Sequence, residues 1–85
     1  MEYDRIKKWQ EFSKYMETEY LDRTIVKYGK QKAPDLMQVT PIIVCIWNII
    51  KYAFRLWNGK DKGREFEKIA HYAQIAWTRW KDGLE

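Results

Sequence analysis

The chain has 85 residues, 46% of them hydrophobic, and a formal net charge of +4. The hydrophobic content, with only four Gly and two Pro, excludes a disordered chain, and the single cysteine excludes an intrachain disulfide. We therefore expect a single helical domain over residues 1–85, with a small core, in a reducing compartment, the cytoplasm.

The first predicted helix covers residues 2–28. Its apolar residues recur at spacings of three to five, which is typical of an amphipathic helix. The spacing is less regular in the second half, so we expect a kink or break within residues 18–24, and Gly29 is the predicted stop. Residues 30–39 form the connector, in which Pro34 disfavours helical backbone at the residue before it.

The second predicted helix covers residues 41–58. Thr40 is a suitable N-cap, Pro41 suits the first helical position, where no N–H is needed, and Gly59 suits the position after the last turn. Apolar residues surround most of this helix, as in a buried central helix. One group is Ile43, Trp47, Ile50, Phe54 and Trp57, and a second group is Ile42, Cys45, Ile49, Ala53 and Leu56.

That apolar helix has two consequences for the whole molecule. Two further helices of an 85-residue chain can hardly cover it, so we expect a homo-oligomer that assembles through residues 41–58. Cys45 lies within this apolar run, and we expect its thiol to be buried and unreactive. The run is interrupted by Asn48, Lys51 and Arg55 and is too short to span a bilayer. The first residues also lack the apolar segment of a signal peptide.

The third predicted helix begins near Arg64 and ends near Asp82, before Gly83. Its apolar residues repeat at helical spacing, and the short turn before it predicts an antiparallel hairpin with the second helix. The predicted fold is all-α: a long N-terminal helix packed on a C-terminal antiparallel helical hairpin. We expect core or interface positions for most tryptophans. The apolar stripe of the third helix is Phe66, Ala70, Ala73, Trp77 and Trp80.

The sequence gives little support to metal or catalytic chemistry. One His and one Cys cannot form a Cys/His metal cluster. Glu17 and Glu19 are two positions apart, as are Glu65 and Glu67, so neither pair shares a helical face. His71 has no evident partner for general-base catalysis, and the turn NGKDKG lacks the spacing of a phosphate-binding loop. We predict a non-enzymatic protein without cofactor or metal, with a nucleotide-processing enzyme as the alternative.

One polar constellation stands out against this apolar background. Residues 51–64 hold five cations against Asp61, so their net charge of +4 equals that of the whole chain. Lys and Arg suit phosphate, Asn suits a base or sugar edge, and Tyr suits stacking. The alternative is that the cations lay their stems on the core and keep their heads in water. The constellation comprises Asn48, Lys51, Tyr52 and Arg55 on one face of the second helix, and Lys68 and Tyr72 one turn apart on the third.

A family resemblance covers about residues 45–77. The run NIIKYAFRLWNGKDKGREFEKIAHYAQIAW resembles the SaV-like proteins, a family of small phage and prophage proteins whose pattern is N-x-I-K-Y-x-x-R, a Gly/Lys turn and an E-D-L-x-K-A-x-x-Y helix. The resemblance implies a viral origin and a helical hairpin, and it adds Lys60 to the candidate ligand-binding residues. The matching residues are Asn48, Ile50, Lys51, Tyr52, Arg55, Lys60, Glu65, Lys68 and Tyr72.

Three functions remain open at this point. The first is a small phage-type accessory or counter-defence protein that binds and sequesters a nucleotide-derived, phosphorylated ligand in the host cytoplasm. The second is a protein–protein inhibitor of a host defence complex, similar in role to an anti-CRISPR protein. The third is a nucleic-acid-binding module, for which a charge of +4 with many interspersed acids is modest.

Overall fold

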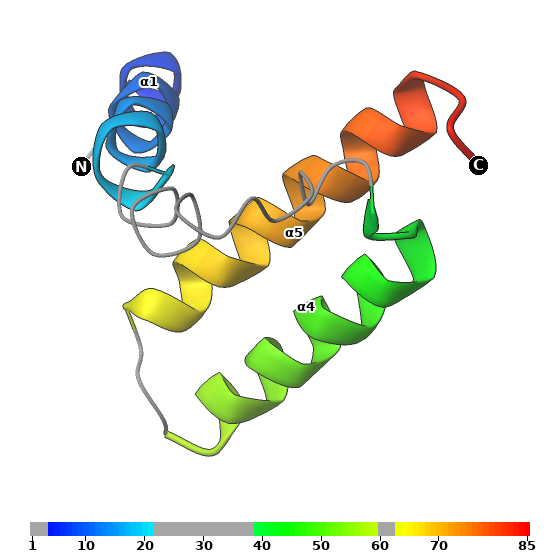
Figure 1. The fold of residues 1–85 in the computed structure, drawn as a ribbon. Coiled ribbons are helices and arrows are strands. Elements are labelled where there is room, and N and C mark those ends of the chain that lie inside the picture. The colour runs from blue at the N-terminus through cyan, green and yellow to red at the C-terminus, as the bar shows by residue number, and fades with distance from the viewer. Residues whose placement is uncertain (1–3, 22–38, 60–62) are drawn as a thin grey trace, which may run out of the picture. The chain divides into compact units, whose positions relative to one another are not determined.

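A computed structural model of the chain describes residues 4–21, 39–59 and 63–85. Within these ranges all regular secondary structure is helical, which confirms the all-α prediction for the described part (Figure 1). The chain divides into two compact units, Met1–Ala33 and Pro34–Glu85, and each is described by itself. In the described part, no helix has both the length and the apolar character needed to cross a membrane.

The N-terminal unit contains helix α1, Arg5–Tyr15, followed directly by a π-helical turn η1, Met16–Tyr20. The Asp4 side chain caps α1 by accepting the backbone N–H of the third helical residue over 3.0 Å. The Thr18 hydroxyl donates to the Lys14 carbonyl at 2.8 Å, a back-bond that often bends a helix.

The π-helical turn overlaps residues 18–24, for which we predicted a kink or break, although it begins slightly earlier, at Met16. The continuous long helix is not supported, because the regular α-helix ends at Tyr15. The rest of the predicted first helix, its stop at Gly29 and the connector over residues 30–38 lie outside the described residues.

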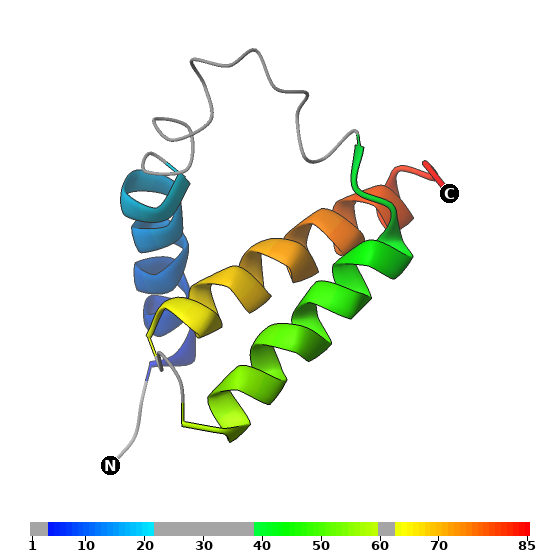
Figure 2. The ribbon, with the colours of Figure 1, turned by 60° about the horizontal axis from the view of Figure 1, so that its bottom comes forward.

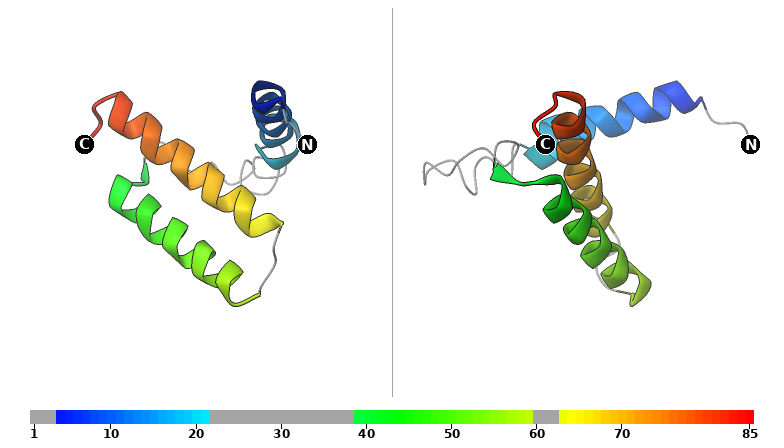
Figure 3. Two further views of the ribbon diagram at one scale, coloured as in Figure 1. Left: turned by 180° about the vertical axis from the view of Figure 1, so that it is seen from behind. Right: turned by 90° about the vertical axis from the view of Figure 1, so that its right-hand side faces the viewer.

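The C-terminal unit is a hairpin of α4, Ile42–Trp57, and α5, Arg64–Lys81. The two helices lie side by side in every view and run in opposite directions (Figures 2 and 3). Gly59 and Gly83 follow the two helix ends with φ of 76° and 67°, a left-handed conformation that glycine adopts readily. The predicted hairpin, both helix ends and both glycine positions are therefore confirmed.

The N-terminus of α4 differs from the prediction. Pro41 occupies the N-cap position and makes no side-chain cap, so the assignment of Thr40 as N-cap was wrong. The Glu85 carboxylate supplies the cap instead, accepting the Ile42 N–H at 2.8 and 3.0 Å. Arg79 Nε also donates to Oε1 of this carboxylate, over 2.8 Å. A carboxylate at a helix N-terminus stabilises the exposed N–H groups and the helix dipole.

The core of the hairpin is small. Among the described residues, the buried hydrophobic side chains are those of Cys45 and Ile75, both 0% exposed, which confirms the predicted burial of Cys45. The face of α5 that contains buried residues carries Glu65, Ile75 and Arg79, so it mixes charged and apolar groups.

Of the two positions expected for most tryptophans, core or interface, the hairpin core is not the one they occupy, and an interface position stays a prediction. Trp47, Trp57, Trp77 and Trp80 are each more than half exposed, because their stripes point away from the contact between α4 and α5. For the same reason the hairpin alone does not bury α4: α5 covers one side of it, where Cys45 is buried.

Candidate functional site

The hairpin brings five of the seven predicted site residues into one cluster. Three lie on α4 and two on α5, and each makes at least one contact with another member or with Glu65. We call this group, with Glu65, the tyrosine–cation cluster. Lys60 lies outside the described residues. The cluster consists of Lys51, Tyr52 and Arg55 on α4, and of Glu65, Lys68 and Tyr72 on α5.

Two stacked tyrosine rings form the middle of the cluster. The ring centroids of Tyr52 and Tyr72 are 6.1 Å apart, with an interplanar angle of 23°. Both residues are half-buried, and aromatic pairs at such separations attract each other beyond the burial of their area. The pair therefore ties the middle of α4 to the middle of α5 and gives the neighbouring cations a fixed aromatic surface.

Two ammonium groups lie over the Tyr52 ring. Lys51 Nζ is 4.7 Å and Lys68 Nζ is 5.0 Å from the ring centroid. At these distances the ring quadrupole attracts a cation by about 0.5–1 kcal/mol at an exposed site. One aromatic ring thus holds two positive charges in one place, one from each helix.

Glu65 is a member of the cluster that we did not predict as a site residue. Its side chain is 1% exposed. Its Oε1 lies 3.6 Å from Arg55 Nε and 3.9 Å from Lys68 Nζ. Its Oε2 has no hydrogen-bond partner among the described residues. A buried carboxylate needs opposite charge nearby, and two loosely placed cations provide it here.

A sequence signal for Glu65 was present. Lys68 follows Glu65 at i+3, a spacing that brings two side chains together on a helix. Glu65 also lies in the first turn of α5, where the helix dipole favours a negative charge. The spacing of Glu65 and Glu67 was used only to judge metal binding. The cationic neighbours of Glu65 were therefore not considered.

Asn48 is directed to its own helix. Its Nδ2 donates to the Val44 carbonyl over 2.9 Å, the usual contact of a polar side chain with the carbonyl one turn earlier. This hydrogen bond uses one N–H of the Asn48 amide. It does not use the amide oxygen or the second N–H. The contacts that join the cluster therefore do not include Asn48.

The charge balance of the cluster favours anions. Lys51, Arg55 and Lys68 oppose the single carboxylate of Glu65, which leaves a formal charge of +2. Arg55 and Lys68 have side chains 51% and 37% exposed. Both are too far from Glu65 for a good hydrogen bond. Both can therefore donate to a phosphate from solvent while still neutralising Glu65.

His71 lies close to the cluster on α5. Its ring is tilted against that of Tyr72, with centroids 6.0 Å apart. Within the described ranges, no group of three or more His, Cys, Asp or Glu side chains could hold a metal ion. The chemistry that the described side chains offer here is charge, hydrogen bonding and aromatic contact.

Comparison with known proteins adds no relative from which a role could be transferred. A scan against protein-family models, a search of curated proteins and a search of solved structures each returned no match. The fold alone defines the class: the described residues are all-α, and the C-terminal unit is an antiparallel helical hairpin.

Proposed function

We propose that this chain is a small non-enzymatic binding protein that captures a phosphorylated, nucleotide-like ligand at the tyrosine–cation cluster. The observation that carries the proposal is the arrangement around Tyr52. Two ammonium groups lie within 5.0 Å of its ring centroid, and the Arg55 guanidinium is half exposed beside them. Positive charge from both helices is therefore gathered next to an aromatic pair.

The three cations have different tasks in this proposal. The Arg55 guanidinium offers a planar pair of N–H donors that suits two phosphate oxygens, and the lysines act as point charges. Charge-assisted hydrogen bonds are worth about 1.5–3 kcal/mol each, so three contribute about 4.5–9 kcal/mol, which corresponds to dissociation constants from about millimolar to about micromolar when the groups are already in place. The tyrosine pair supplies an aromatic wall for the rest of the ligand.

The biological setting follows the resemblance of residues 45–77 to the SaV-like phage proteins. In that setting the ligand is a nucleotide-derived signal of the host, and the role is to withdraw it from a defence system. Sequestration requires binding without turnover, and we assign no acid, base or nucleophile in the cluster to a reaction.

The ligand class is tested by calorimetric titration of the full chain at low ionic strength with three probes. We expect ADP and inorganic pyrophosphate to bind saturably, and adenosine, which has no phosphate, not to bind at the same concentrations. Chromatography after prolonged incubation should recover ADP unchanged. Binding of adenosine alone would contradict a phosphate site, and conversion of ADP would contradict a non-enzymatic protein.

A double variant separates this function from a purely structural role of the cations. Lys51→Met/Arg55→Met keeps an apolar side chain at both positions and removes both charges. The variant should retain its circular dichroism spectrum and lose detectable ADP binding. If it binds ADP as the unmodified chain does, the two side chains only cover the core and the proposed function is wrong.

A further inference from the structure

Helix α4 carries an apolar stripe that α5 leaves uncovered. The side chains of the stripe follow one another at alternating spacings of four and three residues, and each residue is more than half exposed. This is the spacing of core positions in a coiled coil, where a second helix packs along the stripe. We call these residues the α4 seam: Ile43, Trp47, Ile50, Phe54 and Trp57.

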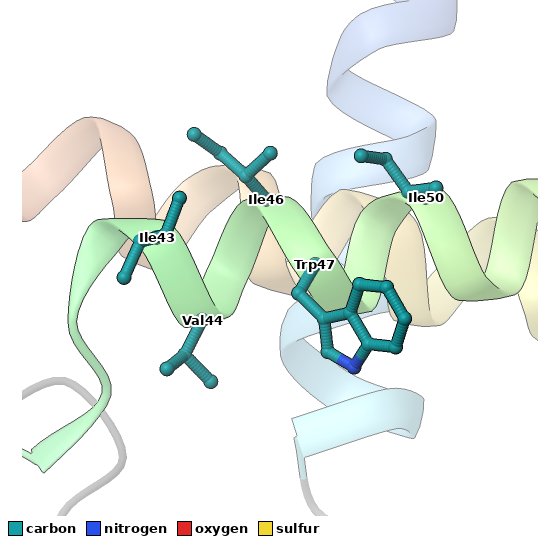
Figure 4. A pocket seen from close by; sticks show the side chains of 5 residues that line it. All are labelled: Ile43, Val44, Ile46, Trp47 and Ile50. Atoms are coloured by element: carbon teal, nitrogen blue, oxygen red, sulfur yellow. The ribbon is translucent and has the colours of Figure 1, made fainter.

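The seam lies apart from the contact with α5. Figure 4 shows the seam residues Ile43, Trp47 and Ile50 on the near side of α4, with α5 passing behind that helix. With Val44 and Ile46 they line one shallow apolar depression. Cys45, which is 0% exposed, lies on the side of α4 that packs on α5. The seam is thus open to a partner while the hairpin stays intact.

The exposed area of the seam is that of an interface. Trp47, Phe54 and Trp57 are 64%, 66% and 87% exposed, and with the aliphatic side chains this gives on the order of 700–800 Å² of apolar surface. The largest apolar patch of a typical soluble monomer is about 300–600 Å². One side of a standard protein–protein interface is about 800 Å².

The composition of the seam favours a second copy of the same helix. The five seam residues carry no charge, and the ammonium of the neighbouring Lys51 is directed to the Tyr52 ring at 4.7 Å. A partner must then be apolar and must repeat at the same spacing. A second α4 meets both conditions, because a two-fold axis places the same surface on both sides of the contact.

The small core of the hairpin also favours association with a second copy. Among its described residues only Cys45 and Ile75 are buried hydrophobic side chains, and a unit with so little buried apolar surface gains stability when a second copy covers more of it. We propose that the α4 seam is the two-fold interface of a homodimer. This proposal does not depend on ligand binding at the tyrosine–cation cluster.

The test is the mass of the full chain in solution, measured by light scattering and by sedimentation over a concentration series. We expect twice the chain mass of 10.5 kDa at micromolar concentration. Ile50→Asp places a charge in the middle of the seam, and it should weaken association at least a hundredfold and give a particle of 10.5 kDa. Ile50 is 55% exposed, so the charge is not buried within one chain and the helix content should persist.

A matched control carries the same charge change elsewhere. Gln74→Glu adds one negative charge to an exposed position of α5 and should leave the dimer mass unchanged. If Ile50→Asp loses helix content, Phe54→Gln, an uncharged change at a seam residue that is 66% exposed, replaces it and should still weaken association. The proposal is overturned if the unmodified chain is still a particle of 10.5 kDa at a concentration about 100-fold above micromolar. It is also overturned if Ile50→Asp and Phe54→Gln both leave the dimer intact.

Discussion

Arg79 and Glu85 hold the open end of the hairpin together. Arg79 Nε donates to Glu85 Oε1 at 2.8 Å, and the same carboxylate accepts the Ile42 N–H at the start of α4. Arg79 is only 8% exposed, and a buried charge is costly unless an opposite charge such as this carboxylate lies beside it. One carboxylate thus joins the last turn of α5 to the first turn of α4.

Removal of that carboxylate should destabilise the hairpin. Glu85→Ala removes one hydrogen-bonded carboxylate from Arg79 and the cap from the Ile42 N–H, and we expect a loss of about 1–3 kcal/mol in the free energy of unfolding. Urea titration followed by circular dichroism measures this loss. Asp82→Ala removes an acid from an exposed position near the same helix end and is the control. Equal stability of the two variants would show that the contacts of Glu85 with Arg79 and Ile42 contribute nothing to the free energy of unfolding.

The sequence predicted elements whose signals are local. The start of α5 near Arg64, its end before Gly83 and the turn at Gly59 depend on neighbouring residues and on backbone conformations that glycine favours. The cap of α4 was predicted wrongly because it comes from Glu85, which is 43 residues away from Ile42. No local pattern contains such a contact.

The face of α5 that packs on α4 could not be identified from the sequence, for a related reason. Its buried positions include Glu65 and Arg79, so it looks polar, whereas the more apolar stripe through Trp77 and Trp80 is exposed. Hydrophobic periodicity identifies the apolar side of a helix but not its partner. The pairing of Lys51 with Lys68 over Tyr52 could be anticipated from the hairpin, while the buried position of Glu65 could not.

Glu65 provides a prediction in which stability and binding respond differently. Glu65→Gln preserves the shape of the side chain and raises the formal charge of the cluster from +2 to +3. Removal of one negative charge at several Å from a bound phosphate should tighten ADP binding about three- to tenfold. Because Arg55 and Lys68 are partly exposed, water can solvate them and the hairpin should stay folded.

Calorimetry with ADP and thermal unfolding of the same sample measure both effects of Glu65→Gln. Lower affinity for ADP with unchanged stability would mean that Glu65 orients the cations instead of competing with the ligand. That result would contradict the electrostatic part of the account. Glu67→Gln, a change of equal charge two residues further along α5, is the control for the general effect of net charge.

Cys45 should be inert and should make the stability depend on pH. Burial raises the pKa of the Cys45 thiol above its ordinary value. The folded state therefore retains the proton after the unfolded chain has lost it. Stability is complete below the unfolded pKa of about 8.5 and falls as the pH rises above it towards the higher folded pKa.

Two measurements check the prediction for Cys45. At pH 8 a thiol reagent should label the native chain far more slowly than the urea-unfolded chain, because the thiol is 0% exposed. The midpoint of urea unfolding should decrease between pH 8 and pH 10 more in the unmodified chain than in Cys45→Ala. Rapid native labelling would show that α4 does not pack on α5 at this position.

The most direct test of the central claim compares two lysines and an arginine in ADP titrations. Lys51 and Lys81 each lie over an aromatic ring. Lys51 Nζ is 4.7 Å from the Tyr52 ring centroid and Lys81 Nζ is 4.8 Å from the Trp77 ring centroid, but only Lys51 belongs to the tyrosine–cation cluster. Loss of one charge-assisted contact of about 1.5–3 kcal/mol should weaken ADP binding about ten- to a hundredfold. The account predicts that loss for Arg55→Met and for Lys51→Met, and an unchanged dissociation constant for Lys81→Met. Equal affinities of all three variants and the unmodified chain would contradict it.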